Sequence, residues 1–219
     1  MGPERTIYQI NQMTVDLIKM GICSEQNFPS INRQSGNITE IGISSADKSI
    51  FLKKISYSEM YAVLLETKNY NMKLIDGALI TLLYRFEKNN IIAHRLSFFP
   101  SPNIESFQNN PEPYLEDEIY LDVLDKRVFP VPLRFDFDSG EAFVPVYHPK
   151  SHFTVGQYEH CRIPVSSALS PFQFIDFIIR NFYYIPKNKK TFNLTEFNDK
   201  FEKSIVSEEE SMIHIRISS

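Results

Sequence analysis

Residues 143–184 read FVPVYHPKSHFTVGQYEHCRIPVSSALSPFQFIDFIIRNFYY and set reactive polar side chains directly before an apolar helix. Three of the five histidines in the chain, one of its two cysteines and an arginine fall within residues 148–162. Polar reactive groups beside a core element are typical of a functional site. We therefore interpret this segment as the part around which the chain is organised.

An apolar helix closes this segment. Ser170 is a favourable N-cap, and Pro171 suits the first helical position. The residues from there to Phe182 are mostly apolar, so the helix must be buried on more than one side. The sequence therefore predicts a helix packed in the core against a sheet.

A half-buried strand precedes the segment. Residues 133–138, LRFDFD, alternate apolar and charged side chains, which is the pattern of such a strand. Arg134, Asp136 and Asp138 share its polar face. A turn at residues 139–141 then sends the chain straight back into residues 143–147, so we expect this charged face to lie beside the histidines that follow.

Two of those histidines, His148 and His152, stand four residues apart. On a helix this spacing aligns two metal ligands, but Pro149 lies between them and the accompanying glutamate is missing, so a zinc site is not predicted. An irregular turn over residues 148–151 between two strands fits better and places both imidazoles at one edge of the sheet. Arg162 follows in a second strand-like segment.

Upstream, residues 70–76, 78–87 and 91–99 are rich in β-formers and predict an antiparallel meander. Asp76-Gly77 and Asn89-Asn90 are the expected tight turns.

On the third of these strands the side chains alternate between two faces. His94 shares a face with Leu96 and Phe98, whereas Arg95 and Ser97 point the other way. The pattern predicts a hydrogen-bonded core histidine at His94.

The remaining elements are predicted from local signals. Gly21 ends an amphipathic N-terminal helix over residues 4–21, and a capping box at Ser56 begins a helix over residues 57–68. Between them the sequence predicts a loop over residues 23–37 and then a short strand at residues 38–43. At the other end we expect a polar helix over residues 194–205 and a final strand over residues 212–217.

Together these elements predict an α+β fold, a single domain over residues 1–219 built on a mainly antiparallel sheet packed against a buried apolar helix, with N-terminal and C-terminal helices. Its core spans residues 56–185, preceded by the helical segment 4–21 and followed by a C-terminal extension, residues 186–219.

Composition limits the classes of function. The 42% hydrophobic and 23% charged content is ordinary for a globular protein. A formal charge of −4 disfavours coating of nucleic acid by bulk electrostatics. There is no apolar run of the roughly 18 to 20 residues that cross a bilayer and no signal segment, so a cytoplasmic protein without a membrane partner is expected. The known phosphate-loop, dinucleotide and cysteine-metal motifs are missing, so neither cofactor nor metal is predicted.

Residues 104–125 are strongly acidic, and prolines interrupt the surrounding segment. The segment is interpreted as a solvated excursion over the surface. A sharper hypothesis makes it a docking surface for a basic protein, or a flap that competes with a polyanionic ligand.

Four stretches carry a family resemblance: LIDGALITLLYRF, HRLSFFPSP, PLRFDFD and HPKSHFTVGQYEHCRIPVSSALSPFQFIDFIIRNFY. Over residues 70–184 they resemble a bacterial family known as domain of unknown function twenty-two ninety, which implies no particular activity. More distantly, the order of parts is similar to the TumE-type toxins of toxin-antitoxin pairs, proposed to be ribonucleases. The matching parts are Asp76 and Gly77, Arg134 and Asp136, His148, Pro149 and His152, and the helix from Pro171.

The first functional hypothesis is an RNA-cleaving effector of a bacterial toxin-antitoxin or anti-phage defence system. RNA is cut without metal when a base takes the 2′-hydroxyl proton, an acid protonates the leaving oxygen, and cations hold the phosphate. His148 and His152 would share the acid and base roles, and Asp136 would orient a histidine or Arg134. The predicted substrate-binding residues are Arg134, Arg162 and Arg95.

Two other hypotheses stay open. A non-catalytic, partner-binding subunit of a defence complex, or an antitoxin-like protein, fits the acidic segment and the net negative charge. A divalent-metal nuclease would use Asp136, Asp138 and Glu141. The expected partners are RNA, a protein bound through residues 104–125, and a second copy of the chain.

Overall fold

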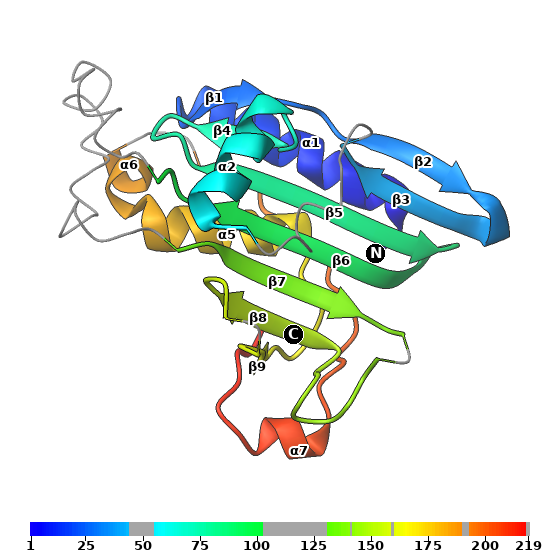
Figure 1. Ribbon diagram of the computed structural model, residues 1–219. Helices are drawn as coiled ribbons and strands as arrows, with labels where there is room; N and C mark the ends of the chain where they lie inside the picture. Colours follow the sequence, from blue (N-terminus) through cyan, green and yellow to red (C-terminus); the bar gives the residue numbers. More distant parts are fainter. Residues whose placement is uncertain (44–54, 103–130, 141, 159, 190–192, 218–219) are drawn as a thin grey trace.

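The computed structural model describes residues 1–43, 55–102, 131–140, 142–158, 160–189 and 193–217 (Figure 1). The acidic segment 104–125 and Glu141 lie outside the described residues, so the hypotheses that depend on them stay predictions. The elements are α1 (Pro3–Lys19), β1 (Cys23–Gln26), β2 (Ser30–Gln34), the short 3-10 turn η1 (Ser35–Asn37), β3 (Ile38–Gly42), α2 (Tyr57–Glu66), β4 (Met72–Leu74), β5 (Leu79–Glu87), β6 (Asn90–Phe99), β7 (Leu133–Asp138), β8 (Ser151–Val155), β9 (Ile163–Pro164), α5 (Pro171–Phe182), α6 (Tyr184–Lys189) and α7 (Ser207–Glu210).

The described strands form one nine-stranded sheet with antiparallel pairing. Its main path runs β1-β4-β5-β6-β7-β8-β9, and the β2–β3 ribbon joins along β5. The α+β fold predicted from the sequence is confirmed. Figure 1 shows the long strands β5, β6 and β7 crossing the middle of the molecule side by side.

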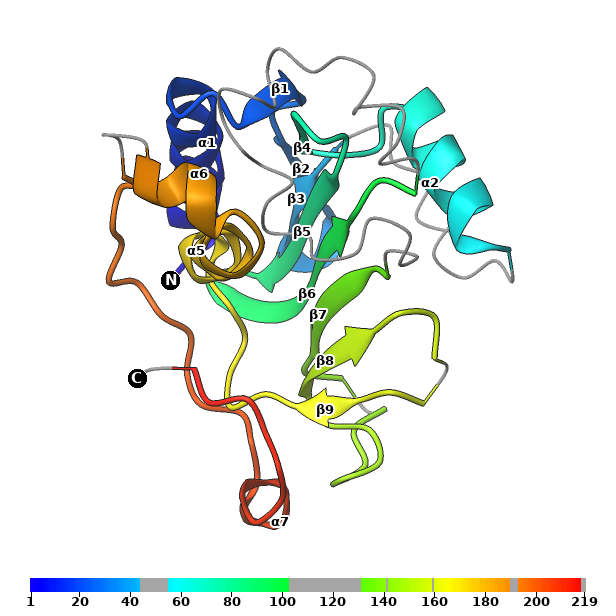
Figure 2. The same cartoon turned by 90° about the vertical axis from the view of Figure 1, so that its left-hand side faces the viewer.

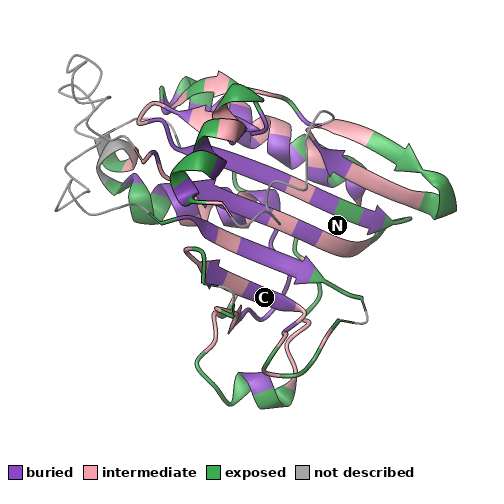
Figure 3. Ribbon diagram, viewed as in Figure 1, coloured by how far each residue is buried: buried purple, intermediate pink, exposed green. Residues whose placement is uncertain are grey.

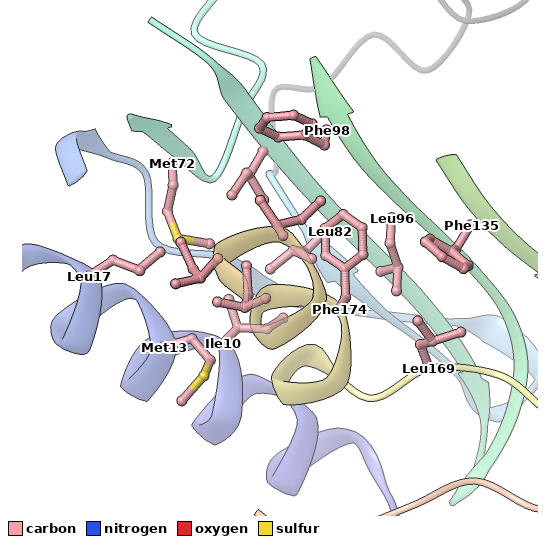
Figure 4. Close-up of a cluster of buried hydrophobic side chains, with 14 of the residues drawn as sticks. Ile10, Met13, Leu17, Met72, Leu82, Leu96, Phe98, Phe135, Leu169 and Phe174 are labelled. Atoms are coloured by element: carbon pink, nitrogen blue, oxygen red, sulfur yellow. The ribbon is translucent and has the colours of Figure 1, made fainter. Parts of the chain in front are cut away.

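The helices α1 and α5 cover one face of this sheet (Figure 2). Both predicted signals for α5 are present, because Ser170 and Gln173 form a reciprocal capping box and Pro171 opens the helix. Phe174 of α5 lies beside Leu82 of β5 and Leu96 of β6, as Figure 4 shows. The predicted burial of the apolar helix in the core is therefore confirmed.

The helix α2 lies on the opposite face and covers only one end of it (Figure 2). Met60 and Leu64 of α2 pack against Leu79 of β5 and Phe99 of β6 in a second, smaller apolar cluster. Farther along the same strands this face carries polar side chains. Figure 3 shows that the central strands are buried and that the β2–β3 end is exposed.

The predicted meander is confirmed with one shift in a turn. Gly77 has a φ of 83°, as the Asp76-Gly77 turn requires. At the second turn the positive φ, 54°, belongs to Lys88, and Asn90 already pairs with Glu87 at the start of β6. The turn therefore lies one residue earlier than Asn89-Asn90.

The prediction of a loop over residues 23–37 is wrong. This segment contains the short strands β1 and β2, of which β1 pairs with β4 and β2 with β3. Asparagine, proline and glycine in the segment are turn-formers, but short edge strands tolerate them because only one side of each strand is paired.

The predicted polar helix over residues 194–205 is also wrong. This segment has no helix; Leu194 and Phe197 are buried against the core, and Lys203 forms a single bridge to Ser167. The predicted strand over residues 212–217 is reduced to one bridge between Ile215 and Val165. The C-terminal region instead contributes the short helix α7. Among the described residues, no helix is long and apolar enough to cross a bilayer.

His94 is a core histidine, as its strand face predicted. It is only 3% exposed, and its Nε2 atom accepts a hydrogen bond of 3.0 Å from the backbone N–H of Leu169, which leads into α5. Burial lowers the pKa of His94 to about 4.

We expect this histidine to make folding sensitive to acid. As the pH falls below 6.5, His94 becomes protonated in the unfolded chain while it stays neutral in the folded chain. The free energy of unfolding therefore decreases from pH 6.5 to about pH 4, and His94 causes no further decrease below that pH. The shift corresponds to about 3 kcal/mol. Urea denaturation of the wild type and of His94→Gln across this range measures the effect, and the variant should show the flatter profile. Parallel profiles would contradict it.

Candidate functional site

The register of three strands brings the central site residues into one row. Arg95 of β6 lies opposite Asp136 of β7, and Asp136 lies opposite His152 of β8. Directly opposite residues in a sheet share a face, so all three side chains emerge on the face away from α1 and α5. The predicted meeting of the charged β7 face with a histidine is confirmed.

Asp136 is the centre of this row. It is 8% exposed, and its two carboxylate oxygens contact different arginines. Arg95 Nε donates a hydrogen bond of 2.9 Å to Oδ1, and Arg134 Nε lies 2.5 Å from Oδ2 as a close ion pair without the alignment of a hydrogen bond. Burial opposes ionisation, but the charges of Arg134 and Arg95 outweigh it and hold the pKa of Asp136 below its ordinary value.

His152 is held as a neutral imidazole with one free nitrogen. It is 6% exposed, and its Nδ1 atom lies 3.1 Å from the carbonyl oxygen of Pro149. A carbonyl can only accept, so Nδ1 carries the proton and Nε2 keeps its lone pair. Burial lowers the pKa of His152 below its ordinary value, although Asp136, with Oδ2 at 3.7 Å from Nε2, acts in the opposite direction.

His148 comes from an irregular turn just before β8. Val144 and His148 close this turn with a two-residue bridge, and Val146 inside it has a φ of 71°. The His148 and His152 rings lie 5.6 Å apart between centroids. Glu209 of α7 supports the turn, because its buried Oε1 accepts a hydrogen bond of 3.2 Å from the backbone N–H of Val146.

The strand partner of β7 differs from the prediction. The turn at residues 139–141 was expected to lead back into a strand at residues 143–147, but these residues form the irregular turn, and β8 is the strand that pairs with β7. The irregular turn predicted at residues 148–151 therefore lies a few residues earlier in the chain, directly before β8.

Arg162 precedes β9, next to the pair formed by Ile163 and Phe153. Its side chain is half-buried and forms no ion pair with a described residue. Together with the row above, it lines an open pocket of about 620 Å³. Six predicted site residues line this pocket: Arg95, Arg134, Asp136, His148, His152 and Arg162.

Sequence reasoning missed several residues that line the pocket, among them Thr154 and the ion pair of Arg85 and Glu40, and it missed Glu209, which supports the pocket from outside. Thr154 lines it beside Arg134, and its position two residues after His152 on one strand was the signal that could have found it. Glu209 supports the His148 turn from the far C-terminal end. No local pattern marks such a long-range contact.

The geometry does not favour a metal site at Asp136. Both of its oxygens contact guanidinium groups, whereas a metal ligand needs a carboxylate oxygen free to coordinate. Within the described ranges, no group of three or more histidine, cysteine, aspartate or glutamate side chains could hold a metal ion.

Comparison with known proteins gives one match. A family model described as "Uncharacterized conserved protein (DUF2290)" matches residues 22–217. No curated protein and no solved structure matches the chain. The match extends on both sides beyond residues 70–184, where sequence motifs alone had suggested it, and includes every residue of the pocket described above. The chain therefore belongs to the DUF2290 family of uncharacterized conserved proteins.

Proposed function

We propose that this protein cleaves single-stranded RNA by acid–base catalysis without a metal ion. The observation that carries the proposal is a pocket lined by four arginines, by the buried Asp136 and by two histidines whose ring centroids lie 5.6 Å apart. Two imidazoles and a set of guanidiniums are the groups that phosphodiester transfer to an internal hydroxyl requires.

His152 is the general base. Its Nε2 atom is unprotonated because Nδ1 donates to the carbonyl of Pro149, and its lowered pKa keeps the ring neutral at physiological pH. In this role Nε2 takes the proton from a ribose 2′-hydroxyl, and the 2′-oxygen attacks the adjacent phosphorus.

His148 is the general acid. His148 is more exposed than His152, so both water and the leaving group can reach its ring. As the bond from phosphorus to the 5′-oxygen breaks, His148 gives that oxygen a proton. The products are an RNA end with a 2′,3′-cyclic phosphate and a second fragment with a free 5′-hydroxyl.

The arginines bind the phosphates of the substrate, and Arg95, which lies in the row of His152, stabilises the charge that develops on the phosphate being cleaved. Arg95 and Arg134 are fixed by Asp136, and Arg162 has no carboxylate partner among the described residues. Guanidiniums bind phosphate oxygens in a planar, bidentate geometry, which favours arginine over lysine at such a site. Asp136 itself is a positioning residue, because it acts through the arginines.

We place this activity in a bacterial toxin-antitoxin or anti-phage defence system. The support is the predicted similarity of the hairpin, the arginine-aspartate strand and the two-histidine turn to TumE-type toxins. In such a system the substrate would be cellular RNA, and a protein partner would restrain the enzyme.

The proposal is tested with two labelled oligonucleotides of one sequence, of which one is RNA and the other has a 2′-deoxy sugar at every position. We expect cleavage of the RNA alone, with equal rates with and without a chelator, and a 2′,3′-cyclic phosphate on the product. Cleavage of the deoxy strand, or loss of activity with the chelator, would overturn the mechanism. A folded protein inert toward RNA would favour the partner-binding alternative.

A further inference from the structure

One cross-strand row beside the histidines contains three buried polar side-chain atoms that make no hydrogen bond with a described residue. One of them, Arg134 Nε, is instead ion-paired with Asp136, whereas the two hydroxyls have no such partner in the described part of the chain. Ser97 lies opposite Arg134, and Arg134 lies opposite Thr154. Ser97 Oγ, Arg134 Nε and Thr154 Oγ1 are all shielded from water and lack a hydrogen-bond partner among the described residues. Only seven side-chain atoms of the described residues are buried without a hydrogen bond, and three of the seven lie in this one row.

Such a concentration calls for a ligand. Buried polar side-chain atoms in native proteins are normally paired, because an unpaired donor keeps its full desolvation cost. Valine would fill the place of Thr154 without that cost, since the two side chains have nearly the same shape. A retained hydroxyl that lines the pocket therefore points to a partner that arrives with the substrate.

The charges around Thr154 define the chemistry of that partner. On one side of Thr154, Arg134 of β7 lies directly opposite it. On the other side, Ile163 of β9 pairs with Phe153, and Arg162 comes directly before Ile163. Two guanidiniums therefore flank one hydroxyl. All three groups donate, so they suit a ligand that has several negative oxygens and accepts only, which is a phosphate group.

We propose that Thr154, Arg134 and Arg162 form a phosphate subsite beside the histidine pair. Thr154 and His152 are two residues apart on β8, or about 6.6 Å along the strand. This separation is comparable to that between neighbouring phosphates of an extended single strand. This inference rests on the proposed function. It implies that the substrate is an oligonucleotide with a further phosphate next to the one being cleaved.

Entry to the subsite requires a small movement. Thr154 Oγ1 exposes less than 1 Å² to water, so phosphate reaches it only after a neighbouring side chain changes rotamer. Arg162 is half-buried and has no ion pair to hold it among the described residues, so its side chain can change rotamer without breaking one. Rotamer changes of this kind take picoseconds to nanoseconds when the side chain is exposed.

Calorimetric titration of the full chain with inorganic phosphate, at constant ionic strength in chloride, tests the subsite. Thr154→Val should weaken phosphate binding about tenfold or more, because a hydrogen bond to a charged group is lost. Thr154→Ser should restore it. Thr81→Val is the matched control, since Thr81 lies in the same row on β5 but does not line the pocket.

The fold provides a second readout. Removing an unpaired hydroxyl should leave the melting temperature of Thr154→Val unchanged or higher, and a threonine with a structural role would show the opposite. Equal phosphate affinity in the wild type and Thr154→Val, or no phosphate binding by the wild type, would overturn the subsite. Thr154-dependent phosphate binding in a protein that leaves RNA intact would overturn the proposed function and keep the subsite.

Discussion

RNA cleavage by the His152→Asn variant is expected to fall by about a hundredfold to ten-thousandfold, which is the contribution of a general base. The asparagine amide nitrogen occupies the position of Nδ1 and can still donate to the carbonyl of Pro149, so the turn before β8 is preserved. What the variant loses is Nε2, the lone pair that takes the 2′-hydroxyl proton.

The measurement is the single-turnover rate on a labelled RNA, with folding checked by thermal denaturation. His148→Ala should lower the rate by a similar factor, and the double variant should be little slower than either single one, because an acid and a base that act together are not additive. His160→Ala is the matched control, since His160 is exposed and does not line the pocket. Undiminished cleavage by the double variant would exclude these histidines.

The pH dependence gives an independent check on the base. Protonation of Nε2 abolishes its function, so the rate should fall as the pH drops through the pKa of His152. Burial holds that pKa below its ordinary value of 6.5, and the acidic limb of the profile should therefore lie below pH 6.5. A rate that already declines between pH 8 and pH 7 would contradict the assignment.

The strongest local patterns in the sequence predicted their elements correctly. Ser170 as N-cap and Pro171 at the first helical position predicted the start of α5, and the alternation in residues 133–138 predicted both β7 and the face on which Asp136 emerges. These signals succeed because the hydrogen bonds or the side-chain periodicity that produce them are contained within a few consecutive residues.

The C-terminal region shows where local patterns fail. Leu194, Phe197 and Phe201 recur every three to four residues, which is the period of an amphipathic helix. In the structure they pack on the core from an irregular segment. The backbone N–H of Thr195 donates to Asp16, and those of Ser204 and Ile205 donate to the carbonyl oxygen of Ser166. The long-range partner decides the conformation, and the sequence of the segment does not contain it.

The sequence predicted which residues belong to the candidate site, but it did not predict how they are arranged in space. Strand alternation placed Arg95 and Asp136 on polar faces, and the predicted turn placed His152 at one edge of the sheet. Their meeting, however, depends on the register of β6, β7 and β8. A shift of one residue in either pairing would send one of these side chains to the opposite face. Register is fixed by the turns and by burial of the whole sheet, so a single strand cannot reveal it.

Replacing Asp136 with asparagine is expected to destabilise the fold by about 2 to 3 kcal/mol. The change removes the negative charge that lies between the guanidiniums of Arg95 and Arg134, and losing one partner of a largely buried ion pair is costly. The value lies below that of a fully buried pair, because the two arginine side chains are 31% and 32% exposed and water reaches them.

Asp138→Asn is the matched control for this variant. Asp138 is two residues farther along the same face, exposed, and its Oδ1 accepts a hydrogen bond from the backbone N–H of Gly140 that asparagine can also accept. We expect a change of less than about 0.5 kcal/mol there. Urea denaturation at pH 7 compares the two variants, and equal stabilities would show that Asp136 does not hold the arginines together.

The Asp136→Asn variant also connects the stability of the fold with catalysis. The pKa of Asp136 is lowered in the folded chain, so its contribution to stability is present above pH 3.8 and is lost as the pH falls through the folded pKa. Asp136→Asn should therefore lose less stability in acid than the wild type. Asp136 also raises the pKa of His152, so its neutralisation should move the acidic limb of the rate profile to lower pH. An acidic limb that stays in place in this variant would mean that the base is not beside Asp136, and would exclude His152 from that role.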